Sequence, residues 1–203
     1  MQYGVQVYSV RDVLGQDFLG TLKQCKEIGY DSVELCGFGG KTPRELLDFC
    51  DPIGLKIGGN HESADAIKPE RIEATIRFYK ELGSPRLIIP GIDLSTRQKL
   101  DDFIALLNYA QPILEKEGLL LGYHNHSHEF LKTEYNAFIH EELQAKTRVS
   151  FEIDTFWAFN AGKDPLALLE QLRERIPVIH LKDGIKGGEG RSLGEGEAPV
   201  AAV

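Results

Sequence analysis

The sequence lacks the features of secreted and membrane proteins. Its three cysteines form no CxxC pair, and an odd number of thiols cannot all pair within one chain, so we expect reduced thiols. The N-terminus, MQYGVQVYSVRD, has no basic segment followed by an apolar one, as a signal peptide would have. No apolar run approaches the roughly 18 residues of a membrane helix. These absences predict a cytoplasmic protein without a membrane partner.

Motifs for binding nucleotides and nucleic acids are also missing. No GxGxxG follows the first predicted strand, no GxxxxGK[ST] occurs, and GFGGK has the spacing of neither motif. The formal net charge is −8 and no Lys/Arg stripe is present, whereas a nucleic-acid surface needs clustered positive charge. We therefore expect no nucleic-acid partner.

One pattern recurs along the chain: an amphipathic stretch, a glycine, then a short apolar run that ends in polar residues, as in EKEGLLLGYHNH. A glycine in this position ends a helix in the left-handed conformation. Gly29, Gly54, Gly83 and Gly118 lie 25 to 35 residues apart, which is the length of a strand-plus-helix unit. The apolar runs are continuous, as is typical of buried parallel strands.

The pattern predicts strands at residues 2–9, 31–36, 55–61, 86–90, 119–126, 149–155 and 177–182. It predicts helices at residues 17–28, 43–53, 69–82, 96–117, 136–146 and 165–175. We expect Asp17 to cap the first helix, and Pro69 and Ser95 to mark the starts of the third and fourth. The alternation favours a (β/α)₈ TIM barrel, as one α/β domain over residues 1–203, over a doubly wound sheet.

Histidines gather where the strand at 119–126 ends, in LLLGYHNHSHEF. Because side chains alternate across a strand, His124 and His126 share one face. The apolar residues of the other face should meet the surrounding helices, so both imidazoles are expected to point into the barrel.

The same alternation turns polar side chains inward on other strands. These residues are Gln6, Tyr8, Glu34, His61, Glu152, Asp154, His180 and Lys182. A single inward polar residue is more often a hydrogen-bonded core residue than a ligand. However, the C-terminal ends of barrel strands all meet at one mouth, so this convergence predicts a functional cavity.

Imidazole and carboxylate groups are good ligands for a divalent ion such as Zn²⁺, Mn²⁺ or Co²⁺. We predict a metal site formed by Glu129, Asp154 and His180. The groups left for proton transfer or hydroxyl binding are Glu34, His61, His124, His126 and Lys182.

Simpler interpretations apply to several of these residues. Glu152 is as well explained by pairing with Lys182 across neighbouring strands as by a direct role. Trp157 fits either the core or a stacking contact with a sugar. His140, within FIHEELQ, is expected on the surface.

Five motifs, GVQVYSVR, GYHNHSHEF, EIDTFWAFNAGKDP, VIHLKDG and LGEGEAP, span nearly the whole chain. In these motifs the chain resembles the xylose isomerase-like TIM-barrel family of sugar phosphate isomerases and epimerases, in its YHNH-containing branch. The resemblance implies a divalent metal (Mn, Zn or Co) held by acidic residues of strands five, six and eight and a histidine of strand seven. By motif, Asp154 and His180 are ligands. The strand-five ligand is His124 or Glu129, and we favour Glu129 because a carboxylate preserves the charge.

The resemblance also implies a small-molecule carbohydrate substrate, which is isomerised or epimerised through an enediolate. The residues expected to transfer protons are His124, His126 and Glu34. The residues expected to bind substrate are Tyr8, His61, Trp157 and Lys182.

Other functions stay open. A related enzyme would expel a β-substituent from a keto-inositol or a 3-keto-glycoside, as a dehydratase or lyase, and a degenerate barrel would bind a sugar without catalysis. The negative charge argues against a DNA endonuclease.

The sequence stops after GEGEAPVAAV, where the family continues to an eighth strand with a metal-binding glutamate. We therefore expect a barrel that lacks its last strand–helix unit, whose open edges favour a homo-oligomer.

Overall fold

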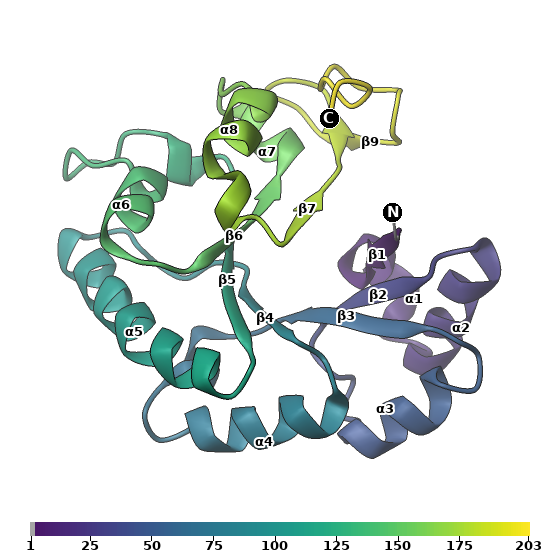
Figure 1. Ribbon diagram of the computed structural model, residues 1–203. Helices are drawn as coiled ribbons and strands as arrows, with labels where there is room; N and C mark the ends of the chain where they lie inside the picture. Colours follow the sequence, from purple (N-terminus) through teal and green to yellow (C-terminus); the bar gives the residue numbers. More distant parts are fainter. Residues whose placement is uncertain (1–2) are drawn as a thin grey trace. The chain divides into compact units, whose positions relative to one another are not determined.

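The structure is a computed structural model that describes residues 3–203, in which strands and helices alternate along the chain (Figure 1). It divides into two compact units. The first comprises Met1–Ile88 and Ile113–Leu120, and the second comprises Ile89–Pro112 and Leu121–Val203. Within residues 3–203, no helix combines the length and the apolar character needed to cross a membrane.

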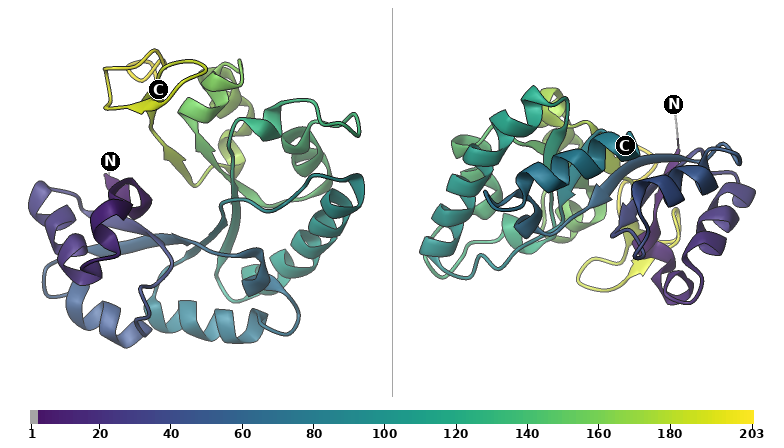
Figure 2. Two further views of the ribbon diagram at one scale, coloured as in Figure 1. Left: turned by 180° about the vertical axis from the view of Figure 1, so that it is seen from behind. Right: turned by 90° about the horizontal axis from the view of Figure 1, so that it is seen from below.

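Parallel strands that pair in chain order form the sheet of the first unit. They are β1 (Gly4–Gln6), β2 (Ser32–Cys36), β3 (Lys56–His61) and β4 (Arg86–Ile89). The helices are α1 (Arg11–Leu14), α2 (Phe18–Ile28), α3 (Pro43–Cys50) and α4 (Ile72–Leu82), with 3₁₀ turns at Val7–Val10 and Ala64–Ile67. Helices α3 and α4 lie side by side in Figures 1 and 2.

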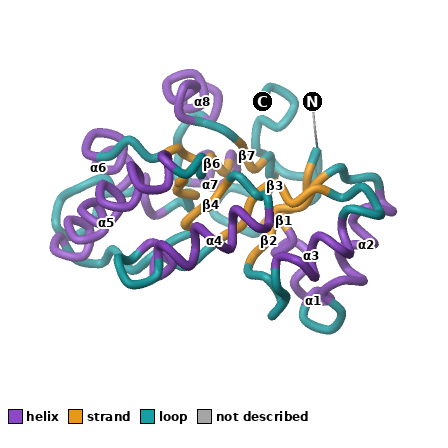
Figure 3. The backbone as a smooth tube through the Cα atoms, turned by 60° about the horizontal axis from the view of Figure 1, so that its bottom comes forward, coloured by secondary structure: helices purple, strands orange, loops and turns teal. Residues whose placement is uncertain are grey.

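Further along the chain, the parallel strands are β5 (Leu120–His124), β6 (Ser150–Asp154) and β7 (Val178–His180). The helices are α5 (Arg97–Lys116), α6 (Ile139–Lys146), α7 (Thr155–Asn160) and α8 (Pro165–Leu172), with 3₁₀ turns at His128–Phe130 and Arg173–Arg175. A short hairpin pairs β8 (Asp183–Gly184) with β9 (Gly190–Arg191). Figure 3 shows the loops that lie between strands and helices along the chain.

Local signals in the sequence set the ends of these helices. The Asp17 carboxylate accepts a hydrogen bond from the Gly20 amide at 2.9 Å and caps α2, as predicted. Thr42 and Glu45 form a capping box at the start of α3. The four glycines of the recurring pattern have φ angles between 66° and 119°, so the prediction that they are left-handed is confirmed.

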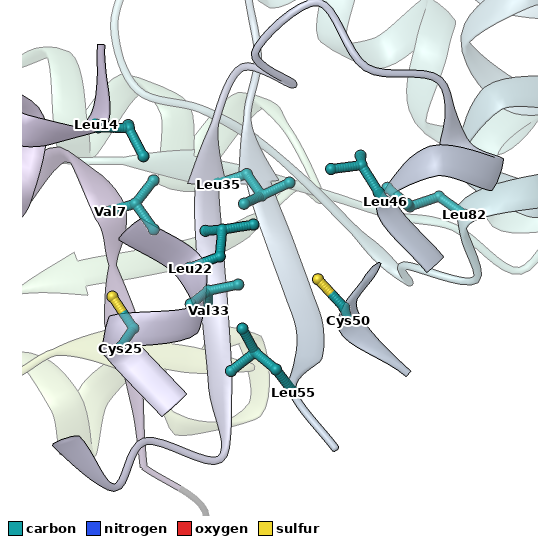
Figure 4. Packing of buried hydrophobic residues seen from close by; sticks show 10 residues of the cluster. All are labelled: Val7, Leu14, Leu22, Cys25, Val33, Leu35, Leu46, Cys50, Leu55 and Leu82. Atoms are coloured by element: carbon teal, nitrogen blue, oxygen red, sulfur yellow. The ribbon is translucent and has the colours of Figure 1, made fainter. Parts of the chain in front are cut away.

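The hydrophobic core of the first unit is formed by apolar side chains of both its strands and its helices (Figure 4). Its buried residues are Val7, Leu14, Leu22, Cys25, Val33, Leu35, Leu46, Cys50, Leu55 and Leu82. Each fully buried aliphatic side chain stabilises the fold by about 1.5–3 kcal/mol. The three cysteines are free thiols, and burial raises the pKa of the Cys50 thiol to about 11.

The predicted strands and helices are observed, with differences at some boundaries, whereas α1, α7 and the β8–β9 hairpin were not predicted. The first strand was expected at 2–9, of which residue 2 lies outside the described residues; β1 ends at Gln6, whose side chain accepts the Tyr8 amide and starts a 3₁₀ turn. Helix α4 begins at Ile72 rather than Pro69, because residues 68–71 form a turn first. Helix α6 begins at Ile139, after a turn in which Asn136 is left-handed, with a φ of 65°.

The expectation that His140 lies on the surface is wrong. Its side chain is fully buried, between the rings of Phe130 at 4.5 Å and Phe151 at 4.7 Å. Its Nδ1 pairs with the Gln144 side-chain amide at 2.7 Å. Burial lowers the pKa of this imidazole to about 3, because the protonated ring would be a charge without solvent.

We expect His140 to make stability pH-dependent. Its folded-state pKa of about 3 lies below the unfolded value of about 6.5. The unfolded chain therefore binds the proton first, and stability is lost as the pH falls from about 6.5 toward 3, by up to about 1.4 kcal/mol per pH unit. Urea unfolding of the wild type and His140→Phe between pH 4 and 7 measures this slope. Equal slopes in the two proteins would contradict the prediction.

Candidate functional site

Two imidazoles and a carboxylate meet where β5, β6 and β7 end. The parallel register sets His124 beside Glu152 on the neighbouring strand. Glu152 Oε2 lies 3.2 Å from His124 Nδ1 and 3.3 Å from His180 Nε2. Glu152 is fully buried and His124 is nearly so. We call His124, Glu152 and His180 the Glu152 cluster.

The Glu152 cluster has a composition and spacing that fit a divalent metal. The three residues offer ligand atoms within 4.8 Å of one another. Ligand atoms about 2.0–2.1 Å from a tetrahedral ion lie about 3.3–3.4 Å apart, close to the two distances measured from Glu152 Oε2. Two imidazole nitrogens with a carboxylate suit Zn²⁺, Mn²⁺ or Co²⁺ better than Mg²⁺ or Ca²⁺.

Asp154 lies beside this cluster and has its own partners. Its Oδ1 accepts the Trp157 amide at 2.9 Å and caps α7, which the sequence did not predict. Its Oδ2 lies 3.5 Å from Lys182 Nζ, and Asp154 is the register partner of His180. Burial raises the pKa of the Asp154 carboxyl, although the nearby Lys182 ammonium opposes this shift. Since Lys182 pairs with Asp154, the pairing of Glu152 with Lys182 that was considered from the sequence is not the one formed.

Lys182 also contacts an aromatic surface. Its Nζ lies 4.3 Å from the centre of the Trp157 ring and 5.6 Å from that of Phe156. Phe156 is fully buried, whereas Trp157 is only partly buried. The partly buried indole and the ammonium are therefore neighbours just after the end of β7.

Glu129, the favoured strand-five ligand, faces other groups. Its Oε1 accepts the Tyr123 hydroxyl at 2.9 Å, and its Oε2 accepts the His126 amide at 2.8 Å. His128 Nε2 lies 3.3 Å from Oε1. Glu129 also lines a cavity of about 260 Å³ beside α6 and α8. Of the two alternatives for strand five, the structure brings His124, and not Glu129, to the Glu152 cluster.

The remaining predicted residues lie in both compact units. In the first unit, His61 Nε2 lies 3.4 Å from Glu34 Oε2, and both side chains are largely buried. Tyr8 is 59% exposed and its ring lies under the Arg11 guanidinium at 4.5 Å. In the second unit, burial lowers the pKa of His126, whose ring is 6.0 Å from Trp157. The roles predicted for these residues stay predictions.

Two residues that support the site escaped the sequence analysis. Asn125 is fully buried; its Oδ1 accepts the Asp154 amide at 3.0 Å and its Nδ2 donates to the Asp154 carbonyl at 3.2 Å. Thr155 Oγ1 donates to the His180 carbonyl at 3.1 Å and accepts the Lys182 amide at 3.2 Å. The sequence did offer a signal for Asn125, because it is the asparagine between the two inward histidines of the YHNH motif.

The fold and the site together define an α/β protein of alternating strands and helices, with imidazoles and carboxylates at the C-terminal strand ends. Comparison with known proteins identifies the class: residues 22–203 match the xylose isomerase-like TIM barrel family. The chain belongs to this family, so the resemblance to the family and the fold class predicted from the sequence are confirmed, whereas the YHNH-containing branch stays a prediction.

Individual relatives extend the comparison. An inosose dehydratase from Geobacillus kaustophilus (strain HTA426) is 23% identical over 186 residues, which cover 80% of this chain and 60% of that protein. The chain thus spans about 60% of the length of the curated relative that it matches. One solved sugar phosphate isomerase/epimerase from Parabacteroides distasonis ATCC 8503 has a TM-score of 0.78 and 25% identity, covering 94% of this chain and 82% of that one. A second from the same organism has a TM-score of 0.77 and 23% identity, covering 93% and 80%.

We expect Asn125 to be essential for holding β5 against β6. Asn125→Ala leaves the amide and the carbonyl of Asp154 without these partners in a buried place, which should lower the free energy of unfolding by about 2–4 kcal/mol. Urea denaturation followed by circular dichroism measures the loss. The control is Asn108→Ala, which removes one exposed hydrogen bond to the Lys146 carbonyl and should cost less than about 1.5 kcal/mol. Similar losses in both variants would contradict this role.

Proposed function

We propose that this chain is a metal-dependent isomerase or epimerase that acts on a sugar or sugar phosphate through an enediolate. The observation that carries the proposal is the Glu152 cluster, which lies at the C-terminal strand ends of a xylose isomerase-like TIM barrel. Active sites of TIM-barrel enzymes lie at these ends. The similarity to sugar phosphate isomerase/epimerases supports the same reaction class.

In this proposal His124, Glu152 and His180 hold the ion, with Asp154 as a fourth donor on the same strand face as Glu152. When bound, the ion would polarise a substrate carbonyl and the hydroxyl on the adjacent carbon, and would thereby acidify the C–H bond of that adjacent carbon. The carboxylates of Glu152 and Asp154 would balance the charge of a divalent cation.

The chain's own residues would bind and orient the sugar. Lys182 would donate hydrogen bonds to substrate hydroxyls from its place beside Asp154, and its positive charge would stabilise oxygen atoms that become negative during proton transfer. Trp157 would cover the apolar face of the sugar ring.

The similarity to an inosose dehydratase supports one alternative from the same first step. There, loss of the proton beside the carbonyl would be followed by departure of the β-hydroxyl as water, which leaves an unsaturated ketone. Incubation with ketoses and with inosose in D₂O separates the two reactions. An isomerase or epimerase gives a product with the same molecular formula as the substrate, except for solvent deuterium on carbon. A dehydratase gives a product that has lost one water molecule. If neither substrate class is converted, the result would contradict both enzyme reactions and favour a barrel that binds a sugar without catalysis.

We expect Glu152→Gln to lower the affinity for Mn²⁺, Co²⁺ or Zn²⁺ by about 100-fold or more, since even residues that only support ligands change affinity 10–100-fold. Turnover should fall in parallel, and His180→Asn should behave in the same way. The control is Glu73→Gln, whose side chain is 87% exposed and which should keep both properties. Elemental analysis of the dialysed protein and isothermal titration measure binding. Unchanged affinity in Glu152→Gln and His180→Asn would contradict the proposed metal site.

A further inference from the structure

A second group of potential ligands lies in the loop after β5. His126, His128 and Glu129 offer ligand atoms within 4.8 Å of one another. Glu129 Oε1 is 3.3 Å from His128 Nε2 and 3.9 Å from His126 Nδ1. We propose that these three residues bind a second divalent cation of the Zn²⁺ class, separate from the ion of the Glu152 cluster. We call them the Glu129 cluster.

The Glu129 carboxylate is oriented in advance for such an ion. Its side chain is fully buried, which is costly for a carboxylate unless charge or hydrogen bonds compensate. The Tyr123 hydroxyl and the His126 amide each bond one of its oxygens, and such bonds fix the direction of a metal-binding carboxylate. Each oxygen can accept a further partner, and Oε1 is the oxygen that lies near both imidazoles.

The buried His126 Nδ1 atom is the second observation that indicates a bound ion. This nitrogen is buried and has no hydrogen-bond partner among residues 3–203. Its separation of 3.9 Å from Glu129 Oε1 is too long for a direct hydrogen bond. A shared ion about 2.0–2.1 Å from each atom accommodates separations up to about 4 Å. A cation between them would therefore satisfy the buried nitrogen and the buried carboxylate together.

His128 gives the ion a path to solvent. Its ring stacks on that of His126, with centres 5.9 Å apart, and its side chain is 60% exposed. The open side leaves room for water to complete the coordination. Two imidazoles and one carboxylate favour Zn²⁺ over Mg²⁺ and Ca²⁺, which prefer ligand sets made of oxygen atoms.

The two clusters share no residue, although they follow each other in the chain. His124 belongs to the Glu152 cluster and His126 to the Glu129 cluster, and Asn125 between them is held by the Asp154 backbone. This anchor fixes the turn at which the chain passes from one cluster to the other. Because an imidazole bound to a metal cannot accept a proton at the ligating nitrogen, the inference removes His126 from the predicted proton-transfer residues.

Zn²⁺ titration of the metal-stripped protein, followed by calorimetry and elemental analysis, tests the inference. The wild type should bind two equivalents. His128→Asn should bind one, because it removes an exposed ligand and leaves Glu129 with both of its hydrogen bonds. Glu152→Gln should also bind one, and the double variant none. Glu134→Gln changes an exposed carboxylate of the loop that follows and should bind two, which controls for general loss of negative charge. Circular dichroism checks that each variant is folded.

The outcomes separate this inference from the proposed function. One equivalent that only His128→Asn removes would keep the Glu129 cluster and overturn the metal site of the Glu152 cluster. One equivalent that only Glu152→Gln removes would overturn the second site. A single equivalent that either variant removes would mean one ion shared by both clusters and would also overturn it, as would two equivalents in His128→Asn or none in the wild type.

Discussion

The parallel register of β5, β6 and β7 is the constraint on which the site depends. It sets His124 beside Glu152 and, two residues further along β6, Asp154 beside His180, so four groups from three neighbouring strands come together near the strand ends. A shift of one residue would turn the inward side chains of a strand to its other face and would break up the Glu152 cluster. The hydrogen bonds of Asn125 to both polar backbone atoms of Asp154 hold this register where the strands end.

Buried charge is the main cost of this arrangement. Glu129 and Glu152 are fully buried and Asp154 is nearly so. Each has compensation of a different kind: backbone and hydroxyl donors for Glu129, imidazoles for Glu152, and a helix N-terminus with the Lys182 ammonium for Asp154. Each buried carboxylate therefore lies among groups that offset the free-energy cost of removing its charge from water.

Much of the fold was predictable from the sequence because each signal is local. Continuous apolar runs identified β2 to β7, and Asp17 and the glycine before each run identified where helices begin and end. Helix α7 was missed because its cap, Asp154, was interpreted only as a ligand. His140 was misplaced because helical periodicity does not reveal that Phe130 and Phe151, from other segments, enclose its ring.

The sequence by itself determined the class of fold, the family, and the inward face shared by histidines and carboxylates, because these follow from alternation along a single strand and from contiguous motifs. Tertiary structure alone decided which of those groups meet. It paired Lys182 with Asp154 rather than Glu152, and it gave Glu129 to Tyr123, His126 and His128 rather than to His180. Partners across strands and loops depend on register and on the path of each turn, and neither is encoded in the spacing of residues along one segment.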